Sequence, residues 1–144
     1  MKLVFSIPIP GGILVSGGYG SGILKTSEIV YLNGLVKQAK PLPEPRNGHC
    51  MAEYQGQIFS TGGWDGRQYS STVWMFNNYV EFTLTNKPEM NYARYYHACG
   101  IFNSSLHGGR PLLVVAGGLT EGKHNSEYLD FTVSGSQWQI CSKS

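Results

Sequence analysis

The sequence of 144 residues is short of charge, because Asp, Glu, Lys and Arg together make up 14% of it, against roughly 25% in an average soluble domain. The net charge of +2 is too small to favour nucleic acid or an anionic membrane surface as a partner. No stretch approaches the roughly 20 consecutive apolar residues of a membrane-spanning helix. The nine acidic residues stand singly, so no carboxylate pair is placed for general acid–base catalysis. We therefore expect no nucleic-acid partner and no membrane partner.

Cysteine is also scarce, and its number is odd. Three cysteines do not make a disulfide framework, and they favour a reducing compartment. We therefore predict a cytoplasmic location, while a secreted one stays open. The first thirteen residues combine an early Lys with an apolar run, as a signal peptide does, but prolines and a glycine pair interrupt that run. The triplet Asn103-Ser104-Ser105 matches the N-glycosylation pattern, which matters only in a secreted chain.

Glycine, in contrast, is abundant, and it recurs in pairs. Three pairs begin at Gly17, Gly62 and Gly117, each directly after an apolar run, and they repeat after 45 and 55 residues. Glycine adopts positive φ and lets backbones approach closely, so a strand that ends in two glycines suits a tight packing corner. Regular recurrence at this spacing indicates a structural repeat.

Each repeat predicts four short antiparallel strands joined by tight turns, and such a meander is the unit of a propeller blade. In the middle unit we expect strands over 49–54, 57–61, 72–76 and 80–84. In the third unit the expected strands are 97–102, 112–116, 127–131 and 137–141. In the first unit they are 4–9, the run before Gly17, 28–32 and 35–39, although two prolines weaken the first of these.

The order of these features resembles the kelch-repeat family over nearly the whole chain. The family pattern is a glycine pair, a Tyr that closes the third strand, a Trp six or seven residues later, and a Pro-rich stretch that ends in Pro-Arg-x-x-His. The matching residues are Gly17-Gly18, Tyr31, Arg46, His49, Gly62-Gly63, Phe76, Phe82, Arg94, His97, Gly117-Gly118, Phe131 and Trp138. The chain is divergent, since only the third unit keeps the Trp and Val4 replaces the first His.

The resemblance implies an all-β fold of three four-stranded β-propeller blades, over about 2–45, 46–93 and 94–144, in one propeller segment spanning 1–144. Propellers typically have 4–8 blades. The chain is therefore expected to be a segment of a longer propeller, or to complete a ring with a second copy, or to form an open arc. An aromatic such as Trp138 is expected in the core, where replacement by Ala costs about 3–5 kcal/mol.

Two His–Cys neighbours raise the question of a metal site. His49 and Cys50 stand at the start of one first strand, and His97 and Cys99 at the start of the next. A zinc site needs three or four ligands, and side-chain alternation along a strand predicts that the two cysteines point in opposite directions. We therefore expect no metal, no cofactor and no catalytic residue. The alternative is a metal-dependent oxidase- or lyase-like propeller enzyme, which stoichiometric metal in the purified protein would favour.

Binding is the function that the loops favour. The loops after the glycine pairs and between the blades are expected on one rim of the propeller. They carry aromatic, Arg and Asn side chains, the first two being typical of protein-binding hot spots. The candidate partner-binding residues are Tyr19, Asn47, Trp64, Arg67, Tyr69, Tyr95 and Tyr96. By resemblance this is a scaffold or adaptor that binds a protein or peptide, while Arg46 and Arg94 are expected to be structural.

Overall fold

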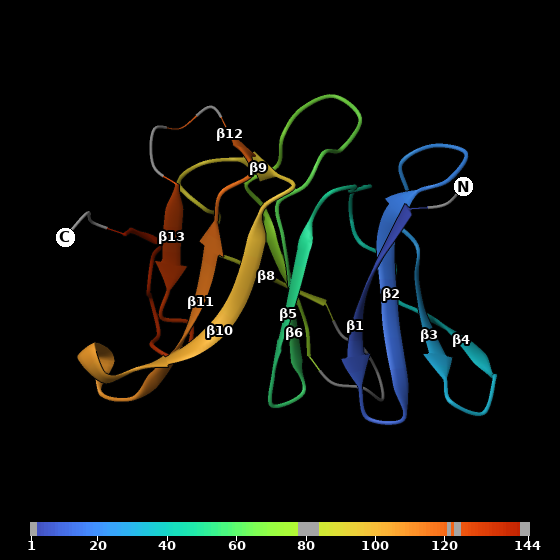
Figure 1. Cartoon of the computed structure of the whole chain (residues 1–144), viewed down its shortest axis with the longest axis horizontal. Helices are drawn as coiled ribbons and strands as arrows, with labels where there is room; N and C mark the ends of the chain where they lie inside the picture. Colours follow the sequence, from blue (N-terminus) through green and yellow to red (C-terminus); the bar gives the residue numbers. More distant parts are fainter. Residues whose placement is uncertain (1–2, 78–83, 121, 123–124, 142–144) are drawn as a thin grey trace.

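The computed structural model describes residues 3–77, 84–120, 122 and 125–141. Within them the chain forms three four-stranded antiparallel sheets and one two-stranded sheet (Figure 1). Each large sheet is a meander of strands in chain order, which follows from the short turns between alternating apolar runs. The predicted all-β fold of four-stranded blades is therefore confirmed. No helix in the described part of the chain is long and apolar enough to cross a membrane.

The first blade shows how proline is accommodated. Its strands are β1 (Leu3–Ile9), β2 (Gly12–Tyr19), β3 (Ser27–Tyr31) and β4 (Val36–Ala39). Pro8 lies opposite Ile13 in the β1–β2 ladder. β1 is an edge strand of this sheet, and proline is tolerated in edge strands because the side that lacks the N–H can face away from the sheet. The first strand therefore forms despite the prolines.

The second blade comprises β5 (Cys50–Tyr54), β6 (Gln57–Thr61), β7 (Val73–Phe76) and β8 (Leu84–Lys87). The bounds of β6 are those predicted, because a turn and a glycine pair delimit it. The fourth strand lies later than expected: β8 begins at Leu84, where we predicted the strand to end. The preceding part of that predicted strand, with Phe82, lies outside the described residues.

The third blade comprises β10 (Ala98–Ser104), β11 (Arg110–Ala116), β13 (Ser126–Leu129) and β14 (Gln139–Ile140). The insertion between β10 and β11 folds as the short 3-10 helix η1 (Ser105–His107). Two further strands, β9 (Arg94–Tyr95) and β12 (Leu119–Thr120), pair with each other where loops were predicted.

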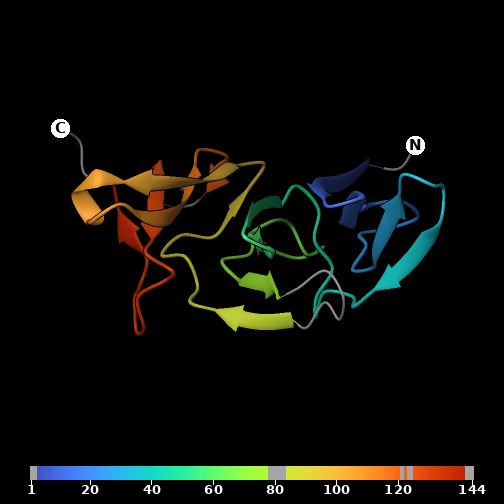
Figure 2. The ribbon, with the colours of Figure 1, turned by 90° about the horizontal axis from the view of Figure 1, so that it is seen from below.

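The three blades lie side by side, as Figures 1 and 2 show from two directions. The first strands are neighbours, because β5 contacts both β1 and β10. The loops that follow the glycine pairs emerge at the upper end of the sheets in Figure 1, and the β1–β2, β5–β6 and β10–β11 hairpins lie at the lower end. We call the upper end the rim.

Two apolar cores lie between the blades. The core between the first and second blades contains Leu14, Ile29, Ile58 and Phe76. The core between the second and third contains Phe59, Met75, Leu113, Leu129 and Trp138, and Trp138 is 4% exposed. Such packing of one sheet face against the next is what holds successive blades together.

Cys50 and Cys99 form a disulfide between the second and third blades, so the prediction that these cysteines point apart is wrong. Cys50 pairs with Thr61, just before Gly62. Its equivalent in the third blade is Ala98, which pairs with Ala116, so Cys99 is one position later and faces the other side of its own sheet. Neighbouring blades pack face to face, so opposite faces of successive sheets meet. Cys141 is the unpaired cysteine.

Candidate functional site

The rim is held in place by two buried arginines that begin successive blades. Arg94 is fully buried, and its guanidinium donates to the carbonyl oxygens of Gly117 (3.0 Å) and Asn125 (2.9 Å) and forms an ion pair with Glu127 (2.9 Å). Arg46 is equally buried and bonds to Glu44 (2.8 Å) and to the carbonyl oxygen of Ser60 (3.2 Å). Both guanidinium groups donate to backbone carbonyl oxygens of their own blade, which explains the two arginines as structural residues.

His49 and His97, which follow these arginines in the sequence, are buried between neighbouring blades. The Nε2 atom of His97 lies 2.8 Å from the Oγ1 atom of Thr61 in the preceding blade. Burial, with the charges of Arg94 and Arg46, lowers the pKa of His97 to about 4. The residues in the described ranges contain no group of three or more His, Cys, Asp or Glu side chains placed to hold a metal ion.

The rim carries four aromatic side chains in contact, which we call the rim aromatic cluster: Trp64, Tyr69, Tyr95 and Tyr96. Tyr69 and Tyr95 stack with ring centroids 5.8 Å apart. Trp64 meets Tyr69 edge-on at 5.6 Å, and Tyr96 lies 3.9 Å from Tyr95. The cluster spans the seam between the second and third blades, so it brings together four of the seven residues that the sequence singled out.

Backbone bonds fix the cluster from below. Asn47 and Trp64 form a two-way bridge in which the amide of Asn47 donates to Trp64 (3.0 Å) and that of Trp64 donates to Asn47 (2.7 Å). The amide of Tyr96 donates to the carbonyl oxygen of Gly48 (2.8 Å). Asn47 is itself buried, so its part here is to position the Trp64 loop.

The two remaining candidates lie apart from the stacked rings. Arg67 is exposed at the tip of the loop, where the Oδ1 atom of Asp65 accepts hydrogen bonds from the amides of Arg67 (2.7 Å) and Gln68 (2.9 Å). Tyr19 ends β2 in the first blade and is 46% exposed. The structure therefore places Arg67 at the tip of the loop that carries Trp64 and Tyr69, and Tyr19 on a different blade.

A cavity of about 310 Å³ adjoins the cluster, and we call it the carboxylate hollow. It is lined by Glu44, Asp65, Gln68, Tyr69, Ser70, Ser71, Thr72 and Glu89. Burial raises the pKa of Glu44, but hydrogen bonds from Thr72 and Trp74 and the charge of Arg46 outweigh it, so the pKa lies below its ordinary value. Among the residues that the structure describes, the lining of the hollow thus has three carboxylates and no Lys or Arg.

Sequence reasoning missed the hollow. Glu44 and Glu89 belong to the Pro-rich connections between blades, whereas Asp65 belongs to the loop between β6 and β7. The available signal was that an acidic residue stands in both connections.

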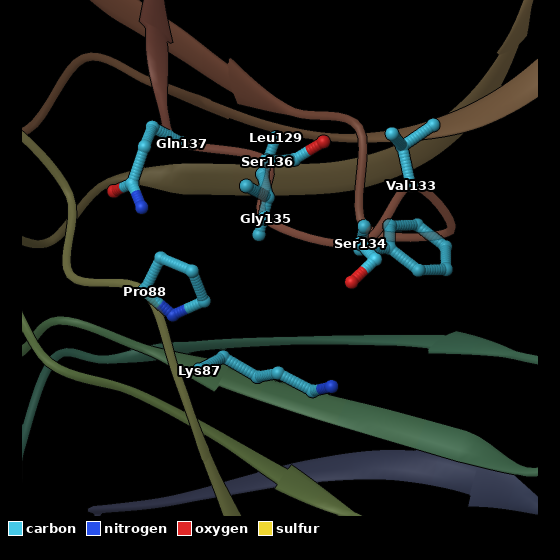
Figure 3. A pocket seen from close by; sticks show the side chains of 9 residues that line it. Lys87, Pro88, Leu129, Val133, Ser134, Gly135, Ser136 and Gln137 are labelled. Carbon is cyan, nitrogen blue, oxygen red and sulfur yellow. The ribbon is translucent and has the colours of Figure 1, made fainter.

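A second cavity, of about 290 Å³, lies between the outer strands of the second and third blades. Figure 3 shows Lys87 and Pro88 on one side and the loop with Ser134, Gly135 and Gln137 on the other. The indole Nε1 of Trp138 donates to the carbonyl oxygen of Pro88 (2.7 Å) in the same seam. This cavity is a gap between blades that the Trp138 contact bridges.

Comparison with known proteins confirms the resemblance. The Kelch motif matches residues 45–77, which include Arg46, His49 and the Gly62 pair. The chain is also similar to the spermatocyte protein spe-26 of Caenorhabditis elegans, with 31% identity over 72 residues. That similarity covers 49% of this chain and 13% of spe-26, so the match spans a small part of its relative.

Proposed function

Because this chain carries a Kelch motif and folds into four-stranded blades, we propose that it is a protein-interaction module. It binds a peptide segment of a partner protein at the rim, through the rim aromatic cluster. The observation that carries the proposal is the contact of the Trp64, Tyr69, Tyr95 and Tyr96 rings with one another at the seam.

The cluster combines rigidity with access. Tyr96 is 53% exposed, while Trp64, Tyr69 and Tyr95 are half-buried. Each ring leans on another, and the backbone bridge at Asn47 holds the Trp64 loop. Aromatic side chains that are already ordered lose little entropy on binding and bury a large area, which is why they dominate interface energetics. A partner segment therefore finds a prepared surface.

The carboxylate hollow adds a preference for charge. Tyr69 lines the hollow and belongs to the cluster, so one bound segment reaches both. The negative charge of Glu44 is paired with Arg46. In the described part of the chain, Asp65 and Glu89 accept hydrogen bonds only from uncharged donors. An Arg or Lys side chain of the partner pairs with these carboxylates and makes a cation–π contact with the face of Tyr69 at the same time. We accordingly propose a partner segment with a basic residue.

Selection from a random peptide library displayed on phage, with the purified chain as bait, tests the rim. The double variant Trp64→Ala, Arg67→Ala is expected to weaken binding of the selected peptides at least roughly tenfold, because hot-spot residues contribute about 2 kcal/mol or more. The matched control is Phe102→Ala, which removes a 62% exposed aromatic from the third blade. Peptides that bind the double variant as tightly as the parent, with melting temperatures equal, would refute the rim site.

The charge preference has its own test. Asp65→Asn with Glu89→Gln is expected to weaken peptides that contain Arg or Lys, and to leave neutral peptides unaffected. Glu28→Gln with Glu53→Gln is the control, since these carboxylates lie outside the hollow. If the selected peptides are acidic, the charge preference is wrong while the aromatic site stands.

Self-association is a second candidate, because an outer sheet face is apolar. Pro8, Ile13, Val30 and Val36 lie opposite one another across all four strands of the first blade. They alternate with Leu14 and Ile29, which pack against the second blade. Such a face fits another blade, either of a longer chain or of a second copy. Light scattering during size exclusion separates these: twice 15.8 kDa indicates a second copy, and a monomer excludes it.

A further inference from the structure

We propose that Asn103 is an N-glycosylation site, occupied in an oxidising compartment where Cys50 and Cys99 become joined. Two unrelated features require the same compartment. One is the acceptor triplet Asn103-Ser104-Ser105, and the other is the disulfide between two blades.

The acceptor is accessible. Asn103 lies near the end of β10, and both it and Ser105 are exposed. The β10–β11 hairpin ends at the lower left of Figure 1, away from the rim, and Leu106 beside the triplet is 91% exposed. A glycan is bulky and hydrated and needs such a position. It would leave the rim aromatic cluster free.

The acceptor also avoids the surface available for another blade. Residues alternate along β10: Ile101 packs on the core between the second and third blades, and Phe102 points to the outer face, where it is 62% exposed. Asn103 therefore points to the side of Ile101, beyond the edge of that core. A blade packed on the outer face of the third sheet would cover Phe102 without covering Asn103.

The disulfide is the independent observation. It joins residues 49 positions apart on β5 and β10, the neighbouring first strands of two blades. Disulfides of this structural kind form and persist in secreted proteins and are rare in the cytosol. The odd cysteine count has a simple origin, since Cys141 is left over. An odd number of cysteines is therefore no longer a reason to expect a reducing compartment.

Both covalent steps are balanced by the co-reactants of that compartment. The two thiols lose two protons and two electrons to a disulfide-bearing oxidoreductase, which is reduced to its dithiol. The amide nitrogen of Asn103 attacks the anomeric carbon of a lipid-linked oligosaccharide pyrophosphate. The new bond joins nitrogen to carbon, the carbon–oxygen bond to the pyrophosphate breaks, and the amide proton passes to a base of the transferase.

The experiment uses the full-length protein purified from the cells that make it. An N-glycosidase digest in heavy-oxygen water is expected to convert Asn103 to a labelled Asp, and to increase mobility on denaturing gels. Variants introduced at the chromosomal locus give the controls. Ser105→Ala and Asn103→Gln should abolish the mobility change, whereas Ser104→Ala preserves the acceptor pattern and should retain it.

Thiol labelling before and after reduction tests whether Cys50 and Cys99 are joined in the native protein. Cys50 and Cys99 are expected to react only after reduction, and Cys141 before it. An unmodified Asn103 overturns the proposal, and so does free reactivity of Cys50 and Cys99 in the native protein. Asn103 and Ser105 are exposed and Ser104 is half-buried, so the melting temperature of each variant is measured, and equal values show that folding is not the cause of a lost glycan.

Discussion

Gly62 of the second blade lies directly against His97 of the third. A Cβ atom on Gly62 would be 2.7 Å from Cε1 of His97 and 2.5 Å from the carbonyl oxygen of Arg94. The first joint repeats this: a Cβ on Gly17 would be 2.8 Å from Cε1 of His49 and 2.7 Å from the carbonyl oxygen of Arg46. The glycine pair is therefore the joint at which one blade contacts the next.

Gly62→Ala is expected to lower the free energy of unfolding strongly. Gly62 has φ +61°, and an alanine in such a conformation costs about 1–3 kcal/mol. The overlap of the added methyl group with one backbone oxygen and one ring carbon increases this cost. Gly11→Ala is the matched control, because Gly11 has φ +78° and no atom of the described residues lies within 4 Å of the added atom. Urea unfolding of both variants measures the difference. Equal losses would show that the joint tolerates a methyl group.

Glu127→Gln is expected to cost about 3–5 kcal/mol, because it leaves the fully buried Arg94 without its counter-charge. The carboxylate also accepts hydrogen bonds from the amides of Asn91 (2.7 Å) and Tyr92 (3.2 Å). Asp130→Asn removes a more exposed ion pair with Arg110 and should cost no more than about 1 kcal/mol. Chemical denaturation tests the contrast, which a similar cost for both variants would contradict.

Loss of the disulfide is expected to lower stability by about 2–4 kcal/mol, since it closes a long loop in the unfolded chain. The double variant Cys50→Ala, Cys99→Ala and the reduced parent should unfold at similarly lowered denaturant concentrations. Cys141→Ala is the control for removal of a thiol alone. An unchanged midpoint on reduction would mean that the bond contributes no stability.

Stability is expected to fall as the pH drops below about 6.5. Burial, with the charges of Arg46 and His97, lowers the pKa of His49 to about 3, and the pKa of His97 lies at about 4. Below pH 6.5 the unfolded chain binds protons that the folded chain does not, so each histidine costs up to about 1.4 kcal/mol per pH unit. Thermal melting between pH 7 and 5 measures this. His97→Gln should make the dependence shallower, and an unaltered slope would contradict its assignment.

Trp138→Ala is expected to cost about 3–5 kcal/mol through the cavity it leaves and the lost bond to Pro88. Leu106→Ala, at a position 91% exposed, is the control with no expected loss. A destabilisation of Trp138→Ala below about 1 kcal/mol would show that the core between the second and third blades does not depend on this side chain.

Local signals in the sequence determined the repeat, the strand meander and the rim. Chain direction reverses at turns and glycine pairs, and these depend on neighbouring residues only, which is why β6 lies where we predicted it. The kelch pattern followed from the same marks, as did the choice of loops that carry the rim aromatic cluster.

The tertiary structure alone decided what meets across the seams. Strand alternation placed Cys50 and Cys99 on opposite faces of their own sheets, and only the stacking of one sheet on the next turned those faces toward each other. The pairing of β9 with β12 and the gathering of Glu44, Asp65 and Glu89 around one hollow have the same origin. A sequence pattern fixes the direction of a side chain within its sheet, but the sheet's neighbour determines what that side chain contacts.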